Sequence, residues 1–150
     1  MTFTSYMTHA LEQAQMAADL GEVPVGAAVI DPDGRILAVA GNRTRTDKDP
    51  TAHAEILAIR QACAELGQDR LTDCALYVTL EPCAMCAAAI AHARIARVYY
   101  GASDPKSGGV AQGARVFEHP QCHHKPDLYD GIEEQACASI LQDFFANLRR

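Results

Sequence analysis

Hydrophobic and polar residues follow two different periodicities along the chain. In some segments the apolar residues recur every third or fourth position, and one segment is an alanine-rich run; both patterns favour helices. The predicted helices are residues 5–20, 53–66, 84–93 and 131–150. Other, shorter runs are almost continuously apolar, which predicts buried strands. The predicted strands are residues 23–31, 35–41, 75–80 and 95–102.

The order of these elements predicts an α/β fold. The sequence DPDG at residues 31–34 has proline at its second position and glycine at its fourth, as in a β-turn. We therefore expect the first two strands to form a hairpin. Beyond the hairpin, helices and strands alternate, which favours a sheet with helices on its faces. Two polar segments, residues 42–51 and 103–113, are expected to be loops.

The composition fits one globular domain inside the cell. The chain has 150 residues, 49% of them hydrophobic, and no linker-like tract, so we expect a single domain over residues 1–150. The first residues lack the basic and apolar regions of a signal peptide, and no apolar run is long enough to span a membrane. We therefore expect a cytoplasmic protein without membrane association. The net charge of −6 argues against a protein that coats nucleic acid, but it allows a local basic patch.

The chain has six cysteines, which in a reducing compartment indicate metal binding or catalysis before disulfides. Cys83 and Cys86 lie three residues apart directly behind Pro82, at the expected start of the alanine-rich helix. Proline suits the first turn of a helix, and residues i and i+3 share a face. The positive partial charge of a helix N-terminus favours the thiolate, which is the form that binds metals. The spacing therefore predicts that both sulfurs bind one metal ion.

His53 is the best candidate for a third ligand, because it lies at the expected start of another helix. One histidine and two cysteines leave a fourth position of zinc for water, as in catalytic sites, whereas a structural zinc has four protein ligands. Two thiolates cancel the charge of the ion and leave its water less acidic, so a base becomes useful, and Glu55 is the natural one. The combined pattern H-x-E and P-C-x-x-C is the signature of zinc-dependent nucleobase deaminases. The sequence therefore predicts one catalytic Zn²⁺ per chain.

Other uses of the histidines and cysteines stay open at this point. A structural zinc needs a fourth protein ligand, for which His92, Cys74 and the sequence HPQCHH are candidates. This sequence is also dense enough in donors for a second metal site, although a polar surface loop is the simpler interpretation. Its possible ligands are His119, Cys122, His123 and His124.

Several longer segments resemble the bacterial tRNA-specific adenosine deaminases. They are EVPVGAAVID, GNRTR, PTAHAEILAIRQAC, LYVTLEPCAMCAAAI, RVYYGASDPKSGG and, more loosely, DFFANLRR. The resemblance is dense over residues 20–110, whereas residues 110–125 depart from the family's pattern. It implies a cytidine deaminase-like fold, which is a three-layer α/β/α sandwich around a five-stranded mixed sheet.

The resemblance also implies a reaction, partners and site residues. Members of the family are homodimers that convert the wobble adenosine of an arginine tRNA to inosine, so the tRNA anticodon stem-loop is the expected partner. Glu55 would carry protons between water and the base. The other residues that the resemblance assigns are the zinc ligands His53, Cys83 and Cys86 and the substrate contacts Asn42 and Ala54.

Two other functions are weighed against this one. The first is a zinc-dependent deaminase of a free base or nucleotide, such as guanine, cytosine or deoxycytidylate. Basic residues after Asn42 and after the Phe144–Phe145 pair favour RNA instead, because they suit phosphate contacts and base stacking. These basic residues are Arg43, Arg45, Lys48, Arg149 and Arg150. The second alternative is a non-catalytic RNA-binding module stabilised by zinc, and Glu55 beside His53 argues against it.

Overall fold

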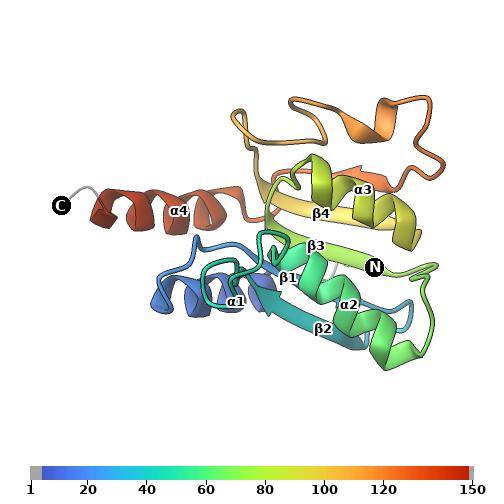
Figure 1. Ribbon diagram of the computed structural model, residues 1–150, viewed down its shortest axis with the longest axis horizontal. Coiled ribbons are helices and arrows are strands. Elements are labelled where there is room, and N and C mark those ends of the chain that lie inside the picture. Colours follow the sequence, from blue (N-terminus) through green and yellow to red (C-terminus); the bar gives the residue numbers. More distant parts are fainter. Residues whose placement is uncertain (1–4, 149–150) are drawn as a thin grey trace.

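The computed structural model of the chain describes residues 5–148 (Figure 1). Its helices are α1 (Met7–Asp19), α2 (Ala54–Leu66), α3 (Ala84–Ala93) and α4 (Glu134–Leu148), with a 3₁₀ turn η1 (Val116–Glu118). Its strands are β1 (Gly26–Ile30), β2 (Ile36–Gly41), β3 (Ala75–Leu80), β4 (Arg97–Ala102) and β5 (Asp127–Tyr129). Arg149 and Arg150, which the sequence suggests as phosphate contacts, lie outside the described residues. Within residues 5–148, no helix has both the length and the apolar character needed to cross a membrane.

The strands form one five-stranded mixed sheet in the order β2-β1-β3-β4-β5. β1 pairs antiparallel with β2, which confirms the predicted hairpin, and also antiparallel with β3. β3, β4 and β5 run parallel, so β3, α3 and β4 form a crossover unit. α3 therefore starts at the carboxyl end of β3, which is the edge where open α/β sheets bind their ligands.

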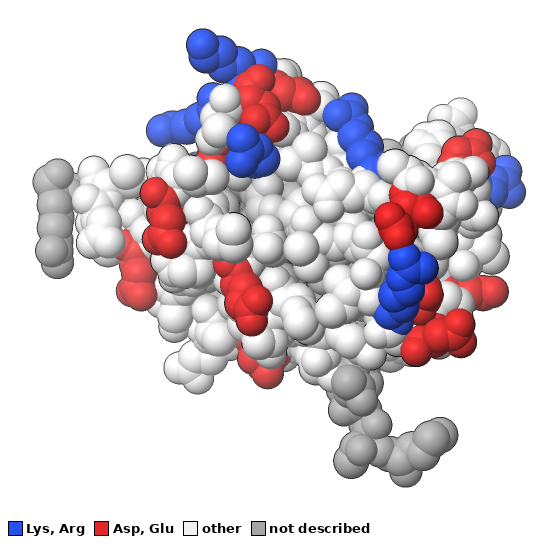
Figure 2. Space-filling view, turned by 90° about the horizontal axis from the view of Figure 1, so that it is seen from below, with Lys and Arg blue, Asp and Glu red and all other residues white. Residues whose placement is uncertain are grey.

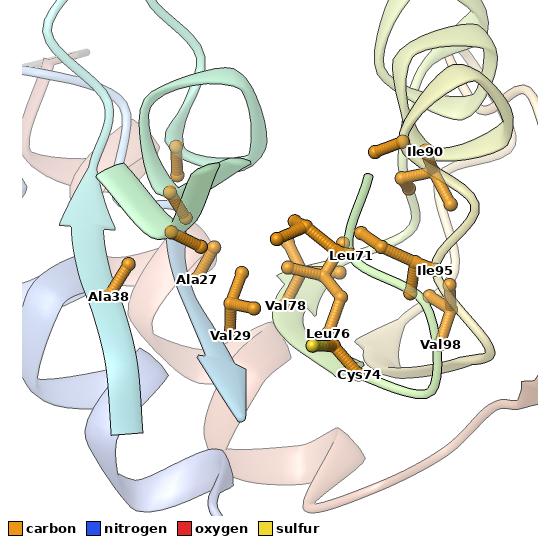
Figure 3. Close-up of a cluster of buried hydrophobic side chains, with 14 of the residues drawn as sticks. Ala27, Val29, Ala38, Leu71, Cys74, Leu76, Val78, Ile90, Ile95 and Val98 are labelled. Atoms are coloured by element: carbon orange, nitrogen blue, oxygen red, sulfur yellow. The ribbon is translucent and has the colours of Figure 1, made fainter. Parts of the chain in front are cut away.

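Helices cover both faces of the sheet, which confirms the three-layer sandwich (Figure 1). α2 and α3 lie on one face, and α1 and α4 lie on the other. Figure 3 shows the larger core, in which Val29, Leu76 and Val98 of three strands gather with Ile90 of α3. Complete burial of one such side chain contributes about 1.5–3 kcal/mol. This packing fixes the helices against the sheet and thereby fixes where their N-termini lie.

The ends of several elements differ from the hydrophobic pattern. β1 begins at Gly26 rather than Val23, because Pro24 has no N–H for the strand ladder. α4 begins at Glu134, so Ile132 lies in the turn before the helix, where it packs on the second core. The apolar pattern does not predict β5, which has three residues and pairs only with β4 at the edge of the sheet. This strand instead matches the fifth strand that the family resemblance implies.

Candidate metal centre and active site

The N-termini of α2 and α3 bring the predicted ligands together. His53 is the N-cap residue of α2 and Cys83 is the N-cap residue of α3; both have extended backbone conformations that precede the first helical turn. Cys86 follows in the first turn of α3 and is fully buried. The short connection from β3 through Pro82 directs α3 toward the start of α2. Two helices that follow different strands therefore contribute to one site, as the sequence predicts.

The distances between the donor atoms fit a tetrahedral metal. The His53 Nδ1 atom lies 3.6 Å from the Cys83 Sγ atom and 3.4 Å from the Cys86 Sγ atom. Zinc bonds of about 2.0–2.1 Å to nitrogen and about 2.3 Å to sulfur, at tetrahedral angles, place such atoms about 3.5 Å apart. One nitrogen and two sulfurs also suit the borderline-soft character of zinc. His53, Cys83 and Cys86 therefore form a candidate zinc site with three protein donors.

Hydrogen bonds already favour a thiolate in this site. The pKa of Cys83 is lowered to about 4, chiefly by a hydrogen bond from the Cys86 thiol, with a further one from His53. The same hydrogen bond, together with burial, raises the pKa of Cys86. The pKa of His53 is raised, first by its hydrogen bond to Cys83. A metal cation would replace these shared protons, so its binding should release protons.

Glu55 lies in the first turn of α2, and only 4% of it is exposed. Burial, the largest influence, raises its pKa from 4.5 to about 7, although nearby groups such as His53 oppose the rise. The carboxyl group does not belong to the group of metal donors that lie within 4.8 Å of one another. A buried carboxyl group with a raised pKa, close to a candidate metal site, has the character that proton transfer requires.

Asn42 and Ala54, the predicted substrate contacts, bond to each other. The Asn42 Oδ1 atom accepts a hydrogen bond of 2.9 Å from the Ala54 backbone N–H. The Asn42 Nδ2 atom donates to the Val23 carbonyl oxygen at 3.2 Å. Asn42 directly follows β2, and its side chain thus connects the end of this strand to the first residue of α2. Its amide group retains one hydrogen for another acceptor. Contact of either residue with a substrate stays a prediction.

A cavity of about 250 Å³ opens beside the candidate metal site. Apolar side chains form one part of its wall, and polar groups converge from the two helix starts and two loops. Its lining residues are Val23, Val25, Asn42, Thr44, His53, Glu55, Leu80, Glu81, Cys83, Asp104 and Ser107. An apolar cavity with a few converging polar groups is typical of a small-molecule or nucleobase site.

Two buried carboxylates near this cavity were not singled out by the sequence analysis. Glu22 accepts hydrogen bonds from the Thr46 backbone N–H at 2.7 Å and the Arg45 backbone N–H at 3.3 Å. Burial opposes its ionisation, but these bonds and one from the Thr46 hydroxyl prevail and lower its pKa. Glu81, which is also buried, accepts hydrogen bonds from several backbone N–H groups. Both residues sit in apolar stretches of sequence, and that is the signal that marks them as buried charges.

The alternative metal ligands do not meet. His124 bonds through its Nε2 atom to the Ile95 carbonyl oxygen at 2.7 Å, and the Cys122 thiol donates to the His124 carbonyl oxygen at 3.1 Å. Among the described residues, the only group of three metal donors is His53, Cys83 and Cys86. Neither His92 nor Cys74 joins that group as a fourth ligand. The HPQCHH sequence forms a loop held by hydrogen bonds within it and to Ile95, and among the described residues its donors do not gather into a group of three.

Comparisons with known proteins place these features in a family. The sequence profile of the MafB19-like deaminases matches residues 1–149. The tRNA-specific adenosine deaminase of Agrobacterium fabrum is 56% identical over 146 residues, which cover 97% of this chain and 95% of that protein. A structure solved in a study of A-to-I editing by tRNA:A34 deaminases has a TM-score of 0.89 and 57% identity, covering 91% of this chain and 98% of that one. The structure of guanine deaminase from Bacillus subtilis has a TM-score of 0.66 and 32% identity. The match covers 100% of this chain and 96% of that one.

Proposed function

Since the chain belongs to the MafB19-like deaminase family and to the tRNA-specific adenosine deaminases, we propose that it converts the wobble adenosine of an arginine tRNA to inosine. The observation that carries this proposal is the convergence of His53, Cys83 and Cys86 near the buried Glu55, at a cavity that His53, Cys83 and Glu55 line. The choice of an arginine tRNA rests on the sequence resemblance. We further propose that residues 1–150 act as one zinc-dependent deaminase domain.

Hydrolytic deamination needs an activated water and a group that moves protons. A zinc ion held by His53, Cys83 and Cys86 would supply the Lewis acid that activates the water. Glu55 takes one proton from the attacking water and gives it to N1 of adenine, while the water oxygen bonds to C6. Glu55 then takes the second water proton from the new hydroxyl group on C6 and passes it to the departing amine. The C6–N6 bond breaks, and ammonia and inosine result. Burial raises the pKa of the Glu55 carboxyl group, which suits a group that both takes up and gives away a proton.

The loop after Asn42 supports RNA as the substrate. Thr44 lines the cavity; of its neighbours, Arg43 is half-buried and Arg45 is exposed. Arg43 pairs with Asp47 through a 3.0 Å contact at the surface, and such an exposed pair is weak enough for Arg43 to exchange to a phosphate. On the face shown in Figure 2, basic and acidic side chains are interspersed around a broad uncharged area. Beside the cavity, Arg43 and Arg45 are the residues that we expect to contact phosphates, as for a short single-stranded loop.

An aromatic pair on α4 offers a second possible contact with RNA. The rings of Phe144 and Phe145 meet edge to face with their centres 5.5 Å apart. Phe145 is 42% exposed, whereas Phe144 is half-buried. An exposed aromatic ring of this kind is a suitable stacking surface for an unpaired base.

A free purine is the second candidate substrate. Its support is the guanine deaminase from Bacillus subtilis, which shares 32% identity with this chain and nearly its full length. A free-base enzyme gains nothing from arginines beside its cavity, so Arg43 and Arg45 favour the first candidate. The two candidates share the metal centre and Glu55, and only a comparison of substrates separates them.

A panel of substrates tests the proposed function. The protein should convert an arginine-tRNA anticodon stem-loop with a wobble adenosine far faster than adenosine, adenine, guanine, cytosine or deoxycytidylate. An anticodon loop is already unpaired, which reduces the cost of extracting its base. Binding of the stem-loop should weaken as salt rises, by a logarithmic slope of about 0.7 for each neutralised phosphate of a single strand. Turnover of guanine as fast as of the stem-loop would instead support the second candidate.

We also propose that the chain is a homodimer that pairs through the outer face of α3. Small residues there, such as Ala88 and Ala89, are half-buried and would let another helix approach closely. Next to them lies an apolar hollow of about 280 Å³, formed by α3 and the segment around Val116 and Cys122.

Light scattering tests this pairing. The mass should be twice that of the 16.2 kDa chain at micromolar concentration. Ala88→Arg, which introduces a charge on the proposed contact, should shift the mass toward that of one chain. Ser139→Arg, on the exposed face of α4, serves as the matched control and should leave the dimer intact. A single-chain mass for the unaltered protein contradicts the proposal.

A further inference from the structure

Glu81 is a buried carboxylate that collects backbone N–H groups from one loop. It follows β3 directly, and only 2% of it is exposed. Its Oε2 atom accepts hydrogen bonds from the backbone N–H groups of Val110 at 3.1 Å, Ala111 at 3.0 Å and Gln112 at 3.0 Å. Its Oε1 atom accepts one from Asp104 at 3.1 Å. All four contacts are with backbone N–H donors, so both carboxyl oxygens of Glu81 act as acceptors.

The charge of Glu81 is balanced by these peptide groups. Among the described residues, no lysine, arginine or histidine forms an ion pair with it. A buried charge of this kind costs stability unless its hydrogen bonds are complete, and an apolar side chain would serve a purely structural purpose at lower cost. The carboxylate is therefore suited to hold a loop in one conformation.

The same loop lies directly against the start of α3. The Gly109 backbone N–H donates to the Pro82 carbonyl oxygen at 2.8 Å, and Gly108 forms an isolated bridge with Cys83. A Cβ atom at Gly109 would lie 2.5 Å from the Ala84 backbone nitrogen, and one at Gly108 would lie 2.5 Å from the Glu81 Oε2 atom. Only glycine permits this close approach at either position. The loop is thus fixed to the segment that carries the first thiol of the metal site.

The loop carries two of the residues that line the cavity, Asp104 and Ser107. The Asp104 Oδ1 atom accepts the backbone N–H groups of Lys106 at 3.2 Å and Ser107 at 3.0 Å, which holds this corner together. The Asp104 backbone N–H is in turn bound by Glu81. A shift at Glu81 should therefore move this wall of the cavity.

We infer that Glu81 is a positioning residue, whose carboxyl oxygens hold residues 104–112 against the start of α3 and so set the substrate-facing wall formed by Asp104 and Ser107. The inference rests on the proposed function, since it assigns that wall to the deaminated base. Glu81 also lines the cavity. Because loop N–H groups occupy both of its carboxyl oxygens, we assign its role to the position of the loop and not to the reacting atoms. Its loss should misplace the base while leaving the metal ligands bound.

Glu81→Gln is the test, because the amide keeps the size of the side chain and places an NH₂ group against backbone donors. Hydrogen exchange of the Val110, Ala111 and Gln112 amides should accelerate by roughly tenfold or more, since hydrogen bonds to a charged group are lost. With the stem-loop substrate, kcat should fall by about 10–100-fold, because a small misplacement of a reacting group costs that much. Zinc content should stay at one per chain, and KM should change less than kcat.

Glu22→Gln is the matched control, as it alters an equally buried carboxylate that holds a different loop. Exchange at residues 110–112 should be unchanged in this variant. Gly109→Ala is the second variant for the proposal, and it should reproduce the loss of kcat while Glu81 is intact. If Glu81→Gln does not fold, the kcat of Gly109→Ala tests the role of the loop instead.

The outcomes separate this inference from the proposed function. If the unaltered protein does not deaminate the stem-loop, the proposed function fails, and faster exchange at residues 110–112 in Glu81→Gln still supports the loop contact. If the unaltered protein is active, and Glu81→Gln has normal exchange at these amides and a normal kcat, the inference is overturned. It is also overturned if the loss of kcat follows only from lost zinc or from a lower folded fraction.

Discussion

Replacing Glu55 by glutamine should abolish deamination while the protein keeps its fold and its zinc. The amide has the shape of the carboxyl group but neither accepts a proton from water nor delivers one to a base. Positioned acid–base groups contribute about 10²–10⁴-fold to the rate, and the loss should reach at least the upper part of that range because Glu55 acts in successive transfers. The measurement is single-turnover inosine formation on the stem-loop, together with zinc analysis of the same sample.

The matched control is Glu65→Gln on the same helix. Glu65 lies at the other end of α2 and pairs with Arg35 at the surface, with 48% of its side chain exposed. Exposed pairs of this kind contribute about 0–1 kcal/mol, so turnover and stability should barely change. Near-normal turnover in Glu55→Gln would remove Glu55 from the mechanism and leave the buried carboxylate without a role.

Replacing His53 by alanine should remove zinc and activity together. Only three protein donors meet in the candidate site among the described residues, so the loss of the nitrogen ligand leaves two sulfurs to hold the ion. Loss of a group that merely supports a ligand already costs about 10–100-fold in metal affinity, and loss of a ligand itself should cost more. Because metal binding is coupled to folding, the melting temperature of the zinc-loaded protein should fall as well.

His92→Ala is the control that separates the two kinds of zinc site. His92 lies on α3, outside the group of donors, and was a candidate fourth ligand of a structural zinc. The variant should keep one zinc per chain, as measured by metal analysis after dialysis. Loss of zinc from His92→Ala, or full retention of zinc by His53→Ala, would contradict the assigned ligand set.

The candidate site was predictable because its chemistry is local in sequence. Cys83 and Cys86 share a helical turn, and Glu55 lies two residues from His53, so short motifs hold the whole arrangement. The extended residues before α2 and α3 then bring the motifs together, although the strands that precede these helices, β2 and β3, are separated in the sheet by β1. The hairpin of β1 and β2 was predictable for the same reason, because the DPDG turn at its tip is a local signal.

The features that escaped prediction depend on contacts between distant segments. Glu81 is one polar residue between a strand and a proline, and its sequence neighbours do not reveal that the amides of residues 110–112 surround it. Glu22 similarly binds a loop more than twenty residues away. β5 has too few residues for a periodicity, and its pairing with β4 creates it. Ile132 has helical spacing, yet its backbone N–H bonds to Tyr100 in the sheet.

The most direct test of the central claim is to follow the wobble adenosine itself in water enriched in the heavy oxygen isotope. The stem-loop is incubated with the zinc-loaded protein, digested to nucleosides and analysed by mass spectrometry. The account predicts that the wobble position becomes inosine, that its base oxygen carries the heavy isotope, and that ammonia appears in equal amount. It also predicts that Glu55→Gln and His53→Ala give neither product. An unchanged wobble adenosine, or inosine without the heavy isotope, would contradict hydrolytic deamination of this base by the site that His53, Glu55, Cys83 and Cys86 form.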